Sequence, residues 1–434
     1  MEENQIHIPE GWHLKQVQEF ALKMRSGGTP KSDNPKFYSG EIPFVAIDDL
    51  TSANKYLEKT QKYITKEGLN NSAAWLVPIN TIMYSIYATL GVPRINLIEA
   101  ATNQAILNII PDESKITLEF LYYLLLEKRS SILAHSAHTT QSNLNAKIVK
   151  ELEFVFPKKT SEQTQIATIL SKVDEAIAQT EQLIAKYTRI KTGLMQDLLT
   201  KGIDKNGNIR SEETHEFKDS PLGRIPKEWE CEMLGDIFDL KTGITPLRAN
   251  SLFFAHEGYN WIKTLDLNEG DLFESEEKIT DYAINKTAIK LRPKGTILIA
   301  MYGGWQQIGR TSLLKSEAAT NQAITALVNP RVKIHSEFLQ LFLQQNRWRW
   351  KQYAVSTRKD PNITKNDISK FYVLFPKDIT EQKLVASKIL KAKELANEYS
   401  NNLAKLQSLK TGLMQDLLSG KVRVNHLIKE TASL

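Results

Sequence analysis

Two stretches of the chain, residues 158–201 and 377–420, carry apolar side chains alternately three and four positions apart, which is the spacing of a heptad repeat. Each stretch predicts a helix of about 38 residues, roughly 57 Å long. Thr160 with Gln163, and Asp378 with Glu381, have the spacing of capping boxes at the helix starts. The pattern therefore predicts two long helices, each with one apolar seam.

Because both seams belong to one chain, pairing of the two helices as an antiparallel coiled coil is the simplest way to bury them. The first seam comprises Ile166, Leu170, Val173, Ile177, Ile184, Tyr187, Leu194 and Leu198. The second seam comprises Val385, Ile389, Tyr399, Leu403, Leu406, Leu413 and Leu417. Lys191 and Lys410 interrupt the seams at equivalent positions, and Gly193 and Gly412 follow them. The glycines indicate close approach of another helix, either within the chain or from a partner.

The chain before each long helix has a different pattern, in which short apolar runs alternate with Gly, Pro and Asn. The runs at 42–47, 81–87, 296–302 and 371–375 predict buried strands, whereas 119–127 and 337–345 predict helices. The fold class is therefore α+β. We expect globular domains at 1–157 and 225–376, long helices at 158–201 and 377–420, a polar linker or packed loop at 202–224 and a tail at 421–434.

An internal repeat relates the two halves. KTGLMQDLL occurs at 191–199 and again at 410–418, ATNQAI at 101–106 and 319–324, and GGTP at 27–30 corresponds to GITP at 243–246. The offset between copies stays between 216 and 219 residues across these motifs, so one ancestral unit was duplicated. The sequence predicts a pseudo-twofold arrangement of two similar domains, each followed by a long helix.

Composition narrows the class of protein only moderately. With 41% hydrophobic and 24% charged residues, the chain resembles ordinary soluble globular proteins. A single cysteine, Cys231, rules out a disulfide framework and favours a cytoplasmic location. Apolar runs such as 120–126 are too short to span a bilayer, so no membrane association is expected. A net charge of +6 is compatible with nucleic-acid binding without establishing it.

No catalytic or metal-binding motif stands out. The chain has no Walker loop, and the glycines at 302–309 lack dinucleotide-binding spacing. His135 and His138 have no accompanying cysteines or acidic cluster, so a surface pair is the better interpretation. The acidic run containing Asp271 weakly resembles a nuclease site but is better explained as a solvated loop. A chain of this size without a catalytic motif usually binds other molecules.

The ordered set of motifs resembles the specificity subunits of type I restriction–modification systems. The resemblance covers nearly the whole chain and rests on GGTP at 27–30, IPFVAIDDL at 42–50, ATNQAIL at 101–107, TTQSNLN at 139–145, EQTQIATILSKVDEAI at 162–177 and the two KTGLMQDLL segments. No single motif is diagnostic, but the set, present twice with a long helix after each copy, is specific.

The resemblance implies a non-catalytic subunit with two target recognition domains, each of which recognises one half of a bipartite, asymmetric site in double-stranded DNA. The helices would fix the spacer length and dock two methyltransferase subunits, and motor-nuclease subunits would complete the complex. S-adenosylmethionine, ATP and Mg would be bound by those partners and not by this chain. Two other functions stay open: a stand-alone regulator that binds a split operator, and a nuclease with a site near Asp271.

Comparison of the copies favours different half-sites, because 51–64 has little in common with 268–280 whereas the helices agree closely. Candidate DNA contacts are polar or Gly-containing segments that match across the repeat. In the first copy they are Ser26, Thr29, Lys31, Tyr84, Tyr87, Arg94, Thr140, Gln141 and Asn143. In the second they are Lys241, Thr242, Thr245, Arg248, Tyr302, Trp305, Arg310, Arg358, Lys359 and Asn362.

Each candidate segment also has a structural interpretation. GGTP could be a tight turn, and Asn103 and Asn321 of ATNQAI could satisfy backbone groups. Tyr84 and Tyr87 alternate with apolar neighbours and could be core residues. In RWRWKQY at 347–353, helical spacing places Trp348 in the core and leaves Arg347, Arg349 and Lys351 on an exposed rim.

Overall fold

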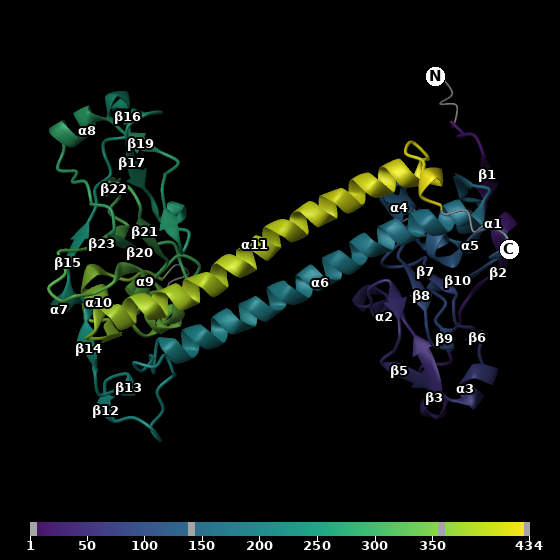
Figure 1. Cartoon of the computed structure of the whole chain (residues 1–434), viewed down its shortest axis with the longest axis horizontal. Coiled ribbons are helices and arrows are strands. Elements are labelled where there is room, and N and C mark those ends of the chain that lie inside the picture. Colours follow the sequence, from purple (N-terminus) through teal and green to yellow (C-terminus); the bar gives the residue numbers. More distant parts are fainter. Residues whose placement is uncertain (1–6, 138–143, 355–360, 429–434) are drawn as a thin grey trace. The chain divides into compact units, whose positions relative to one another are not determined.

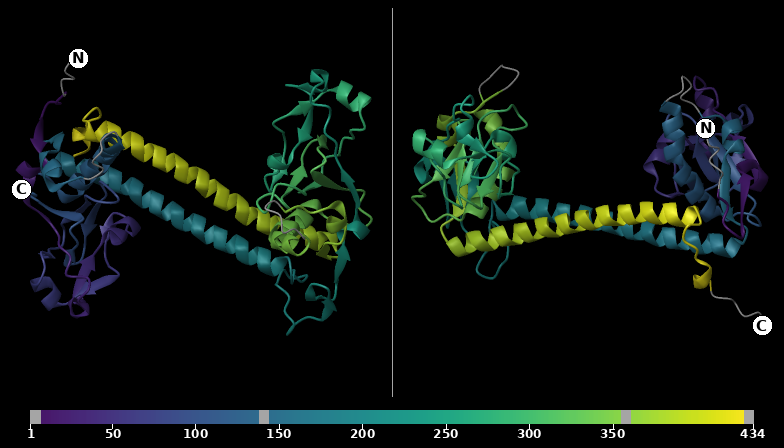
Figure 2. Two further views of the ribbon diagram at one scale, coloured as in Figure 1. Left: turned by 180° about the vertical axis from the view of Figure 1, so that it is seen from behind. Right: turned by 90° about the horizontal axis from the view of Figure 1, so that it is seen from above.

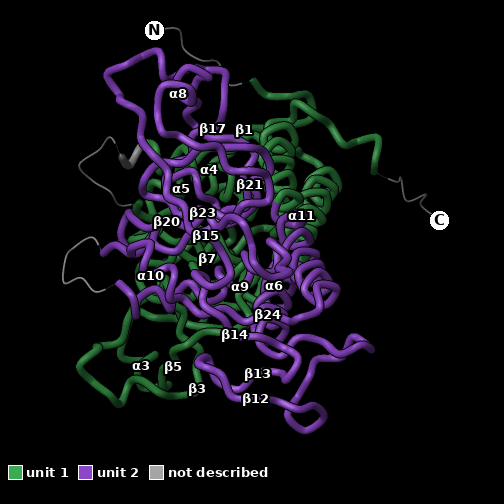
Figure 3. The backbone as a smooth tube through the Cα atoms, turned by 90° about the vertical axis from the view of Figure 1, so that its left-hand side faces the viewer, with its two compact units in different colours: residues 1–181, 401–434 green, residues 182–400 purple. Residues whose placement is uncertain are grey.

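In the computed structural model, which describes residues 7–137, 144–354 and 361–428, the chain divides into two compact units. Unit 1 comprises residues 1–181 and 401–434, and unit 2 comprises residues 182–400 (Figure 3). Helix α6 (Thr160–Leu198) and helix α11 (Ile379–Leu418) therefore each contribute to both units. Figures 1 and 2 show these helices side by side and antiparallel, which confirms the predicted arrangement.

Two sheets and one short ladder form the globular part of unit 1. The ladder pairs β1 (Trp12–Gln16) with β11 (Glu153–Pro157). The larger sheet has the order β2 (Ala21–Ser26), β10 (Ile106–Pro111), β7 (Ile82–Ser85), β8 (Pro93–Asn96), β4 (Tyr56–Leu57). The smaller sheet has the order β5 (Lys62–Ile64), β3 (Tyr38–Val45), β9 (Ala100–Thr102), β6 (Leu76–Val77). The helices are α1 (Val17–Phe20), η1 (Pro35–Phe37), α2 (Ile47–Ser52), α3 (Lys66–Asn70), α4 (Leu118–Ala137) and α5 (Ala146–Glu151).

Unit 2 repeats the ladder and the larger sheet, whereas its smaller sheet differs in its edge strands. The ladder pairs β14 (Trp229–Met233) with β24 (Tyr372–Pro376). The larger sheet has the order β15 (Asp239–Thr242), β23 (Ile324–Val328), β20 (Ile297–Ala300), β21 (Thr311–Leu314), β18 (Asp271–Leu272). The smaller sheet has the order β16 (Phe254–Ala255), β19 (Lys278–Ile279), β17 (Tyr259–Ile262), β22 (Ala318–Thr320). The helices are α7 (Leu234–Ile237), η2 (Ser251–Phe253), η3 (Thr264–Asp266), α8 (Asp281–Lys286), α9 (Ser336–Gln345), η4 (Arg347–Gln352) and α10 (Lys365–Ser369).

The central strands are buried on both faces, which explains their continuous apolar runs. In unit 1, Tyr84 of β7 and Leu107 of β10 pack in one cluster with α4, whereas their neighbours Met83 and Ile106 pack with Val45 of the smaller sheet. A strand covered on both faces has no polar alternation. The strands predicted at 42–47 and 81–87 overlap β3 and β7, which end earlier, at Val45 and Ser85, and the α+β class is confirmed.

The ends of the long helices are buried in the cores of the globular domains. Ile166 and Leu170, near the start of α6, share one core with Leu417 and Leu418 at the end of α11. In unit 2 the exchange is reversed, because Val385 and Ile389 of α11 share a core with Leu198 at the end of α6. The seam predicted as a coiled coil is thus buried at its two ends by the domains.

Between those ends, the seam residues are half-buried and the helices touch mainly each other. Tyr187 of α6 stacks on Tyr399 of α11 with ring centroids 5.5 Å apart. In unit 1, Lys410 pairs with Asp174 at 2.6 Å, which explains one of the two lysines in the seam. A side chain added at Gly193 or Gly412 would meet no atom within 4 Å. Close approach within the described chain therefore does not account for either glycine.

A glutamine in the first turn of each long helix ties that helix to its domain. The Gln163 side chain donates to the carbonyls of Lys115 and Pro157, both at 2.9 Å, and accepts from the Thr117 amide at 2.8 Å. Gln382 makes the same three kinds of bond with Lys333, Pro376 and His335. The capping-box prediction for Thr160 with Gln163 is therefore wrong, because a buried glutamine serves three groups of the domain.

The glutamate that precedes each of these glutamines binds an arginine in the segment that follows the other long helix. Glu381 accepts bonds of 2.6 and 3.0 Å from Arg210, which follows α6. Glu162 accepts bonds of 2.7 and 3.0 Å from Arg423, which follows α11. We call these two contacts the Arg–Glu clamps. Of the capping box predicted for Asp378 with Glu381, the Asp378 cap is confirmed, because its side chain accepts from the Thr380 amide at 2.8 Å, whereas the Glu381 part is wrong, because Glu381 is committed to its clamp.

The segments that carry the clamp arginines are packed on their units. Ile203 and Ile225, which flank Arg210, are buried in the unit 2 core, and a hairpin pairs β12 (Phe217–Ser220) with β13 (Gly223–Pro226). In unit 1, Val424 is buried beside η5 (Asn425–Leu427). Of the two interpretations for 202–224, the packed loop fits this arrangement.

Candidate nucleic-acid interface

The GGTP and ATNQAI motifs of unit 1 form one tightly packed turn. A side chain at Gly27 would meet the Thr102 carbonyl oxygen at 2.0 Å, so only glycine fits there. Thr29 donates a hydrogen bond to Gln104, and the Asn103 side chain accepts from the Ala105 amide at 3.1 Å. The structural interpretation of Asn103 therefore holds.

Unit 2 builds the same turn from the second copies of these motifs. A side chain at Gly243 would meet the Thr320 carbonyl oxygen at 1.8 Å, and Thr245 donates to Gln322. Asn321 accepts from the Ala323 amide at 3.0 Å. Thr29 and Thr245 are exposed, so a DNA contact by either stays a prediction, but the recurrence of the motif is explained by packing.

The loop after β7 holds the most accessible aromatic candidate of unit 1. Tyr87 is 39% exposed, whereas Tyr84 is fully buried and its hydroxyl has no hydrogen-bond partner among the described residues. The core interpretation of Tyr84 therefore applies, and burial raises its pKa. Gly91 takes φ +73° in this loop, and Arg129 of α4 donates from Nε to the Leu90 carbonyl at 3.1 Å.

The corresponding loop of unit 2 is held in the same way. Arg347, which follows α9, donates from Nε to the Ile308 carbonyl at 3.0 Å, and Gly309 takes φ +71°. Tyr302 and Trp305 of this loop are 43% and 48% exposed. The predicted role of Arg347 as a free rim residue is wrong, because its guanidinium is occupied by Ile308, Gln306 and Glu269.

Arg129 was not among the predicted site residues. The signal that could have found it is the repeat, since Arg129 and Arg347 stand 218 positions apart, the same offset as ATNQAI. Both arginines support a loop that carries an exposed aromatic side chain. The two loops differ in length and sequence, IYATLGV at 86–92 and MYGGWQQIG at 301–309.

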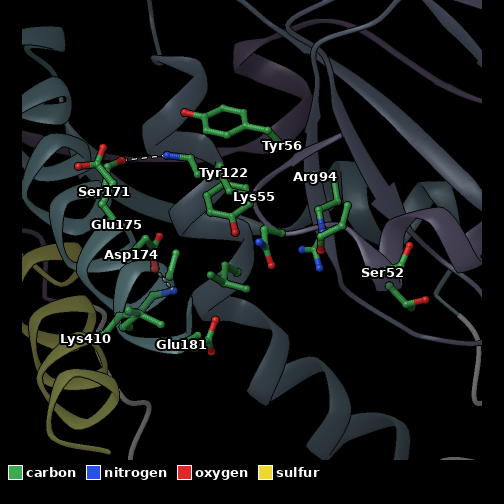
Figure 4. A pocket seen from close by; sticks show the side chains of 16 residues that line it. Ser52, Lys55, Tyr56, Arg94, Tyr122, Ser171, Asp174, Glu175, Glu181 and Lys410 are labelled. Atoms are coloured by element: carbon green, nitrogen blue, oxygen red, sulfur yellow. Dashed lines mark hydrogen bonds and ion pairs between the residues drawn. The ribbon is translucent and has the colours of Figure 1, made fainter. Parts of the chain in front are cut away.

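A cavity of about 530 Å³ lies in unit 1 between the globular domain and the long helices. Figure 4 shows Arg94 on one side of this cavity and Asp174, Glu175 and Lys410 on the other. Arg94 donates to the carbonyls of Ala53 at 2.9 Å and Pro93 at 2.7 Å. Burial lowers the pKa of its guanidinium, whereas Tyr122 raises that pKa and the charge of Arg129 lowers it.

A polar network joins the wall of this cavity to both long helices. Tyr123 of α4 donates to Asp174 at 2.6 Å, and Asp174 pairs with Lys410. Lys55 donates to Ser171 at 2.9 Å and pairs with Glu119 at the start of α4. Burial and the Asp174 hydrogen bond raise the pKa of Tyr123, so the tyrosine is the donor in this network.

Unit 2 fills the equivalent place with a glutamate. Glu269 pairs with Arg347 at 2.6 Å, and its carbonyl accepts from Gln344 at 2.8 Å and from Lys393 of α11 at 3.4 Å. The Leu313 amide binds the carbonyl of Gly270 at 3.0 Å, just as the Ile95 amide binds that of Lys55 at 3.0 Å. These matched bonds make Asn54 the structural counterpart of Glu269.

Two candidates of unit 2 already have partners within the chain. Arg248 pairs with Glu277 and lies 4.9 Å from the centroids of both Phe254 and Trp261. Arg310 donates to the Leu267 carbonyl at 3.4 Å and is half-buried. Both stay predictions, although the charge of Arg248 is compensated.

The other candidates are less constrained. Lys31, Lys241, Thr242 and Asn362 are exposed, and Ser26 is half-buried at the end of β2. Five candidates lie outside the described residues: Thr140, Gln141, Asn143, Arg358 and Lys359.

The aromatic-basic segment after α9 differs from the expectation. Trp348 is 63% exposed, whereas Trp350 is 1% and Arg349 is 6% exposed. Arg349 donates to the Tyr372 carbonyl at 3.1 Å and lies over the Phe371 ring. The prediction of a core Trp348 is wrong because α9 ends at Gln345 and the tighter η4 helix, with about three residues per turn, changes which side chains face inward.

The acidic run near Asp271 is neutralised by lysine and arginine. Asp271 pairs with Lys315 at 3.1 Å, and Glu276 and Glu277 pair with Lys263 at 2.8 and 2.6 Å. Within the described ranges, no group of three or more His, Cys, Asp or Glu side chains is placed to hold a metal ion. No helix of the described chain is long and apolar enough to cross a membrane.

Comparison with known proteins identifies relatives along the whole chain. The profile of the type I restriction modification DNA specificity domain matches twice, at residues 9–189 and 226–408. The MjaIX specificity subunit of a type I restriction enzyme from Methanocaldococcus jannaschii is 24% identical over 425 residues, which cover 97% of this chain and 95% of the relative.

Solved structures share the fold. The S subunit of a type I restriction–modification system from M. genitalium aligns with a TM-score of 0.59 and 18% identity, covering 96% of this chain and 97% of that one. A second chain, whose structure concerns complex assembly of the type I R-M system, aligns with a TM-score of 0.54 and 16% identity over 96% of this chain and 100% of its own. Two matches to the family profile, on the two copies of one duplicated topology, show that this chain belongs to the family of type I restriction–modification specificity subunits.

Proposed function

We propose that the chain is the non-catalytic subunit that recognises a bipartite, asymmetric site in double-stranded DNA, with one globular domain for each half. The observation that carries this proposal is that two copies of one scaffold present different loops. The turns around Gly27 and Gly243 share a threonine–glutamine hydrogen bond and an asparagine that accepts from a backbone amide, whereas the loops at 86–92 and 301–309 differ in length and in exposed aromatic residues. Different loops on one scaffold are suited to different base sequences.

The long helices are the proposed docking surface for two methyltransferase subunits. Gly193 and Gly412 stand at equivalent positions with open space around them. A glycine inside a helix destabilises it by about 1 kcal/mol relative to alanine. Since no contact within the described chain requires these glycines, close approach of a partner helix is the simplest explanation for both.

The chemistry of the complex would lie on the partners. Methyltransferase subunits would bind S-adenosylmethionine and modify an adenine in each half-site, and motor-nuclease subunits would bind ATP and Mg. The proposed place of action is the cytoplasm, where these substrates and the DNA are found together.

Co-expression of this chain with the methyltransferase subunit of its own system tests the function. Genome-wide mapping of methylated adenines is expected to give one motif with two defined halves and an undefined spacer. Exchange of residues 12–157 with 229–376 is expected to reverse the order of the two halves without changing either.

Two results would replace this function with another. Tight binding of a split site by the chain alone, with no methylation in the presence of the methyltransferase, would favour a stand-alone regulator. Cleavage of DNA by the purified chain with Mg would favour a nuclease, and Asp271→Asn would then abolish the cleavage.

A further inference from the structure

We propose that Arg94 and Arg129 of unit 1 form a binding site for a backbone phosphate of DNA, and that Glu269 closes the equivalent place in unit 2. The inference rests on the proposed function, since it assigns a contact within one recognition domain. It also makes the two domains unequal in how they hold the DNA backbone.

Arg129 is oriented with part of its guanidinium unused. Its Nε is committed to the Leu90 carbonyl, which directs the guanidinium toward the loop that carries the exposed Tyr87. The two terminal nitrogens of Arg129 have no hydrogen-bond partner among the described residues. A guanidinium fixed at Nε with both terminal nitrogens open presents two parallel donors, which matches the oxygens of a phosphate.

Arg94 brings a second positive charge to the same place. Its Nε and one terminal nitrogen are held by backbone carbonyls of Ala53 and Pro93, so the side chain is fixed while its charge is not neutralised. The repeat places Arg129 nearby, because Arg94 binds the carbonyl next to Asn54, and in unit 2 the counterparts of Asn54 and Arg129, Glu269 and Arg347, are 2.6 Å apart. Within the described ranges, neither arginine has an ion-pair partner, which leaves two neighbouring half-buried cations without a counter-ion.

Such a pair is unfavourable without an anion, because like charges repel more strongly where water is partly excluded. The cavity also has an acidic side formed by Asp174, Glu175 and Glu181 of α6. Asp174 pairs with Lys410, and among the described residues neither Glu175 nor Glu181 forms an ion pair with Arg94 or Arg129. The counter-ion of the arginine pair is therefore expected from outside the chain.

Unit 2 shows which chemical group fits this place. The counterpart of Arg129 is Arg347, which supports its loop through the same Nε–carbonyl bond and carries the carboxylate of Glu269 at 2.6 Å. Asn54 stands at the position of Glu269 in unit 1, and Ser312 stands at the position of Arg94 in unit 2. At this place unit 2 thus has one arginine that is paired with a carboxylate of its own chain. Unit 1 has two arginines there and no carboxylate partner for them among the described residues.

A DNA phosphate is favoured over a carboxylate of a partner protein because of the neighbouring loop. The arginine that would bind the anion also fixes Leu90 and Gly91, next to the exposed Tyr87. A phosphate bound at Arg129 would position the duplex against that loop, and such contacts set the register of a protein on DNA.

The test compares Arg94→Gln with Arg94→Lys in the full chain, using a fluorescent duplex of random sequence between 50 and 200 mM salt. Loss of one phosphate contact lowers the slope of log affinity against log salt by about 0.9, which is about 3-fold over this range. We expect that loss for Arg94→Gln and an unchanged slope for Arg94→Lys, which keeps the charge. An equal loss in both variants would mean that Arg94 acts only through its carbonyl bonds, and would overturn the proposal, as would an unchanged slope in both.

A second pair of variants leaves both arginines in place. Asn54 is exposed, so Asn54→Glu and Asn54→Gln are both expected to fold. Asn54→Glu copies the arrangement of unit 2 and is expected to lower the salt slope by about 0.9, whereas Asn54→Gln is expected to leave it unchanged. Equal slopes for the two variants would overturn the proposal.

A binding assay with the methyltransferase subunit distinguishes a DNA phosphate from a carboxylate of that partner as the bound anion. If Arg94→Gln weakened capture of the methyltransferase subunit and left the DNA slope unchanged, the anion would be a carboxylate of that partner and the proposal would be wrong. Failure of the proposed function is recognised independently, because the methylation map of the wild-type complex would then show no bipartite motif.

Discussion

The two units are alike where the long helices enter their domains and differ where the loops face outward. Both units bury a Gln–Glu pair at the helix start, and both close an Arg–Glu clamp on it. The places corresponding to Asn54 and Glu269 differ in charge, and the loops that Arg129 and Arg347 support differ in length. The side chains that tie the long helices to their domains have thus stayed the same, whereas those at Asn54 and Glu269 and in the supported loops have changed.

The motifs that recur in both copies are packed parts of the scaffold. GGTP and ATNQAI recur because Gly27 and Gly243 lie against carbonyl oxygens that leave no room for a side chain. Matching segments therefore mark the scaffold, and the segments that differ are the better candidates for recognition of different half-sites.

The largest expected effect comes from breaking the clamps. In unit 2 the side chains of Arg210 and Glu381 are 8% and 9% exposed. Arg210→Ala would leave a buried carboxylate bound only by the Ile203 amide and the Trp229 indole, and should lower the stability of unit 2 by about 3–5 kcal/mol. In unit 1 the Glu162 side chain is 3% exposed but Arg423 is 31% exposed, so water can reach the carboxylate in place of the arginine, and Arg423→Ala should destabilise unit 1 by less, about 1.5–3 kcal/mol.

Amide hydrogen exchange measures this difference separately in the β14–β24 ladder and the β1–β11 ladder. Arg224→Ala is the matched control, because its ion pairs with Glu212 and Asp219 lie at the surface and should contribute nothing measurable. Equal losses for Arg210→Ala and Arg423→Ala would show that burial does not distinguish the two clamps.

A smaller effect is expected in the seam between the long helices. Lys410 pairs with Asp174, but the repeat puts Lys393 at the position of Asp174 and Lys191 at the position of Lys410. Lys410→Met should therefore lower the free energy of unfolding by about 1 kcal/mol, because Asp174 keeps only its Tyr123 bond. Lys191→Met should cause no loss in urea denaturation followed by circular dichroism, and a loss as large as that of Lys410→Met would contradict the assigned pairing.

The smallest effect is expected when the carboxylate charge of Glu269 is removed, and it concerns the salt dependence of DNA binding. Glu269→Gln should free one terminal nitrogen of Arg347 and steepen the salt dependence of DNA binding by about 0.9, which makes unit 2 resemble unit 1. Glu257→Gln removes an exposed carboxylate elsewhere in unit 2 and serves as the control. Identical slopes for these two variants would show that general charge, and not the place of Glu269, sets the change.

The structure places some of the predicted site residues at the surface and buries others. Tyr87, Tyr302 and Trp305 are accessible on loops, as expected for residues that could contact DNA. Tyr84 could not be separated from Tyr87 by pattern, because they lie three positions apart and β7 ends between them. The sequence did not predict a role for Arg129, because the carbonyl group that it binds, that of Leu90, is 39 positions away.

The sequence by itself determined the duplication, the two long antiparallel helices, the α+β class and the family. These properties depend on local periodicity and on motifs repeated at a nearly constant offset, which a linear pattern records. Only the tertiary structure decided that Glu162, Gln163, Glu381 and Gln382 connect helices to domains, and that Trp350 and not Trp348 is buried. The physical reason is distance along the chain: the two clamps join residues 171 and 261 positions apart, and no local pattern specifies such partners.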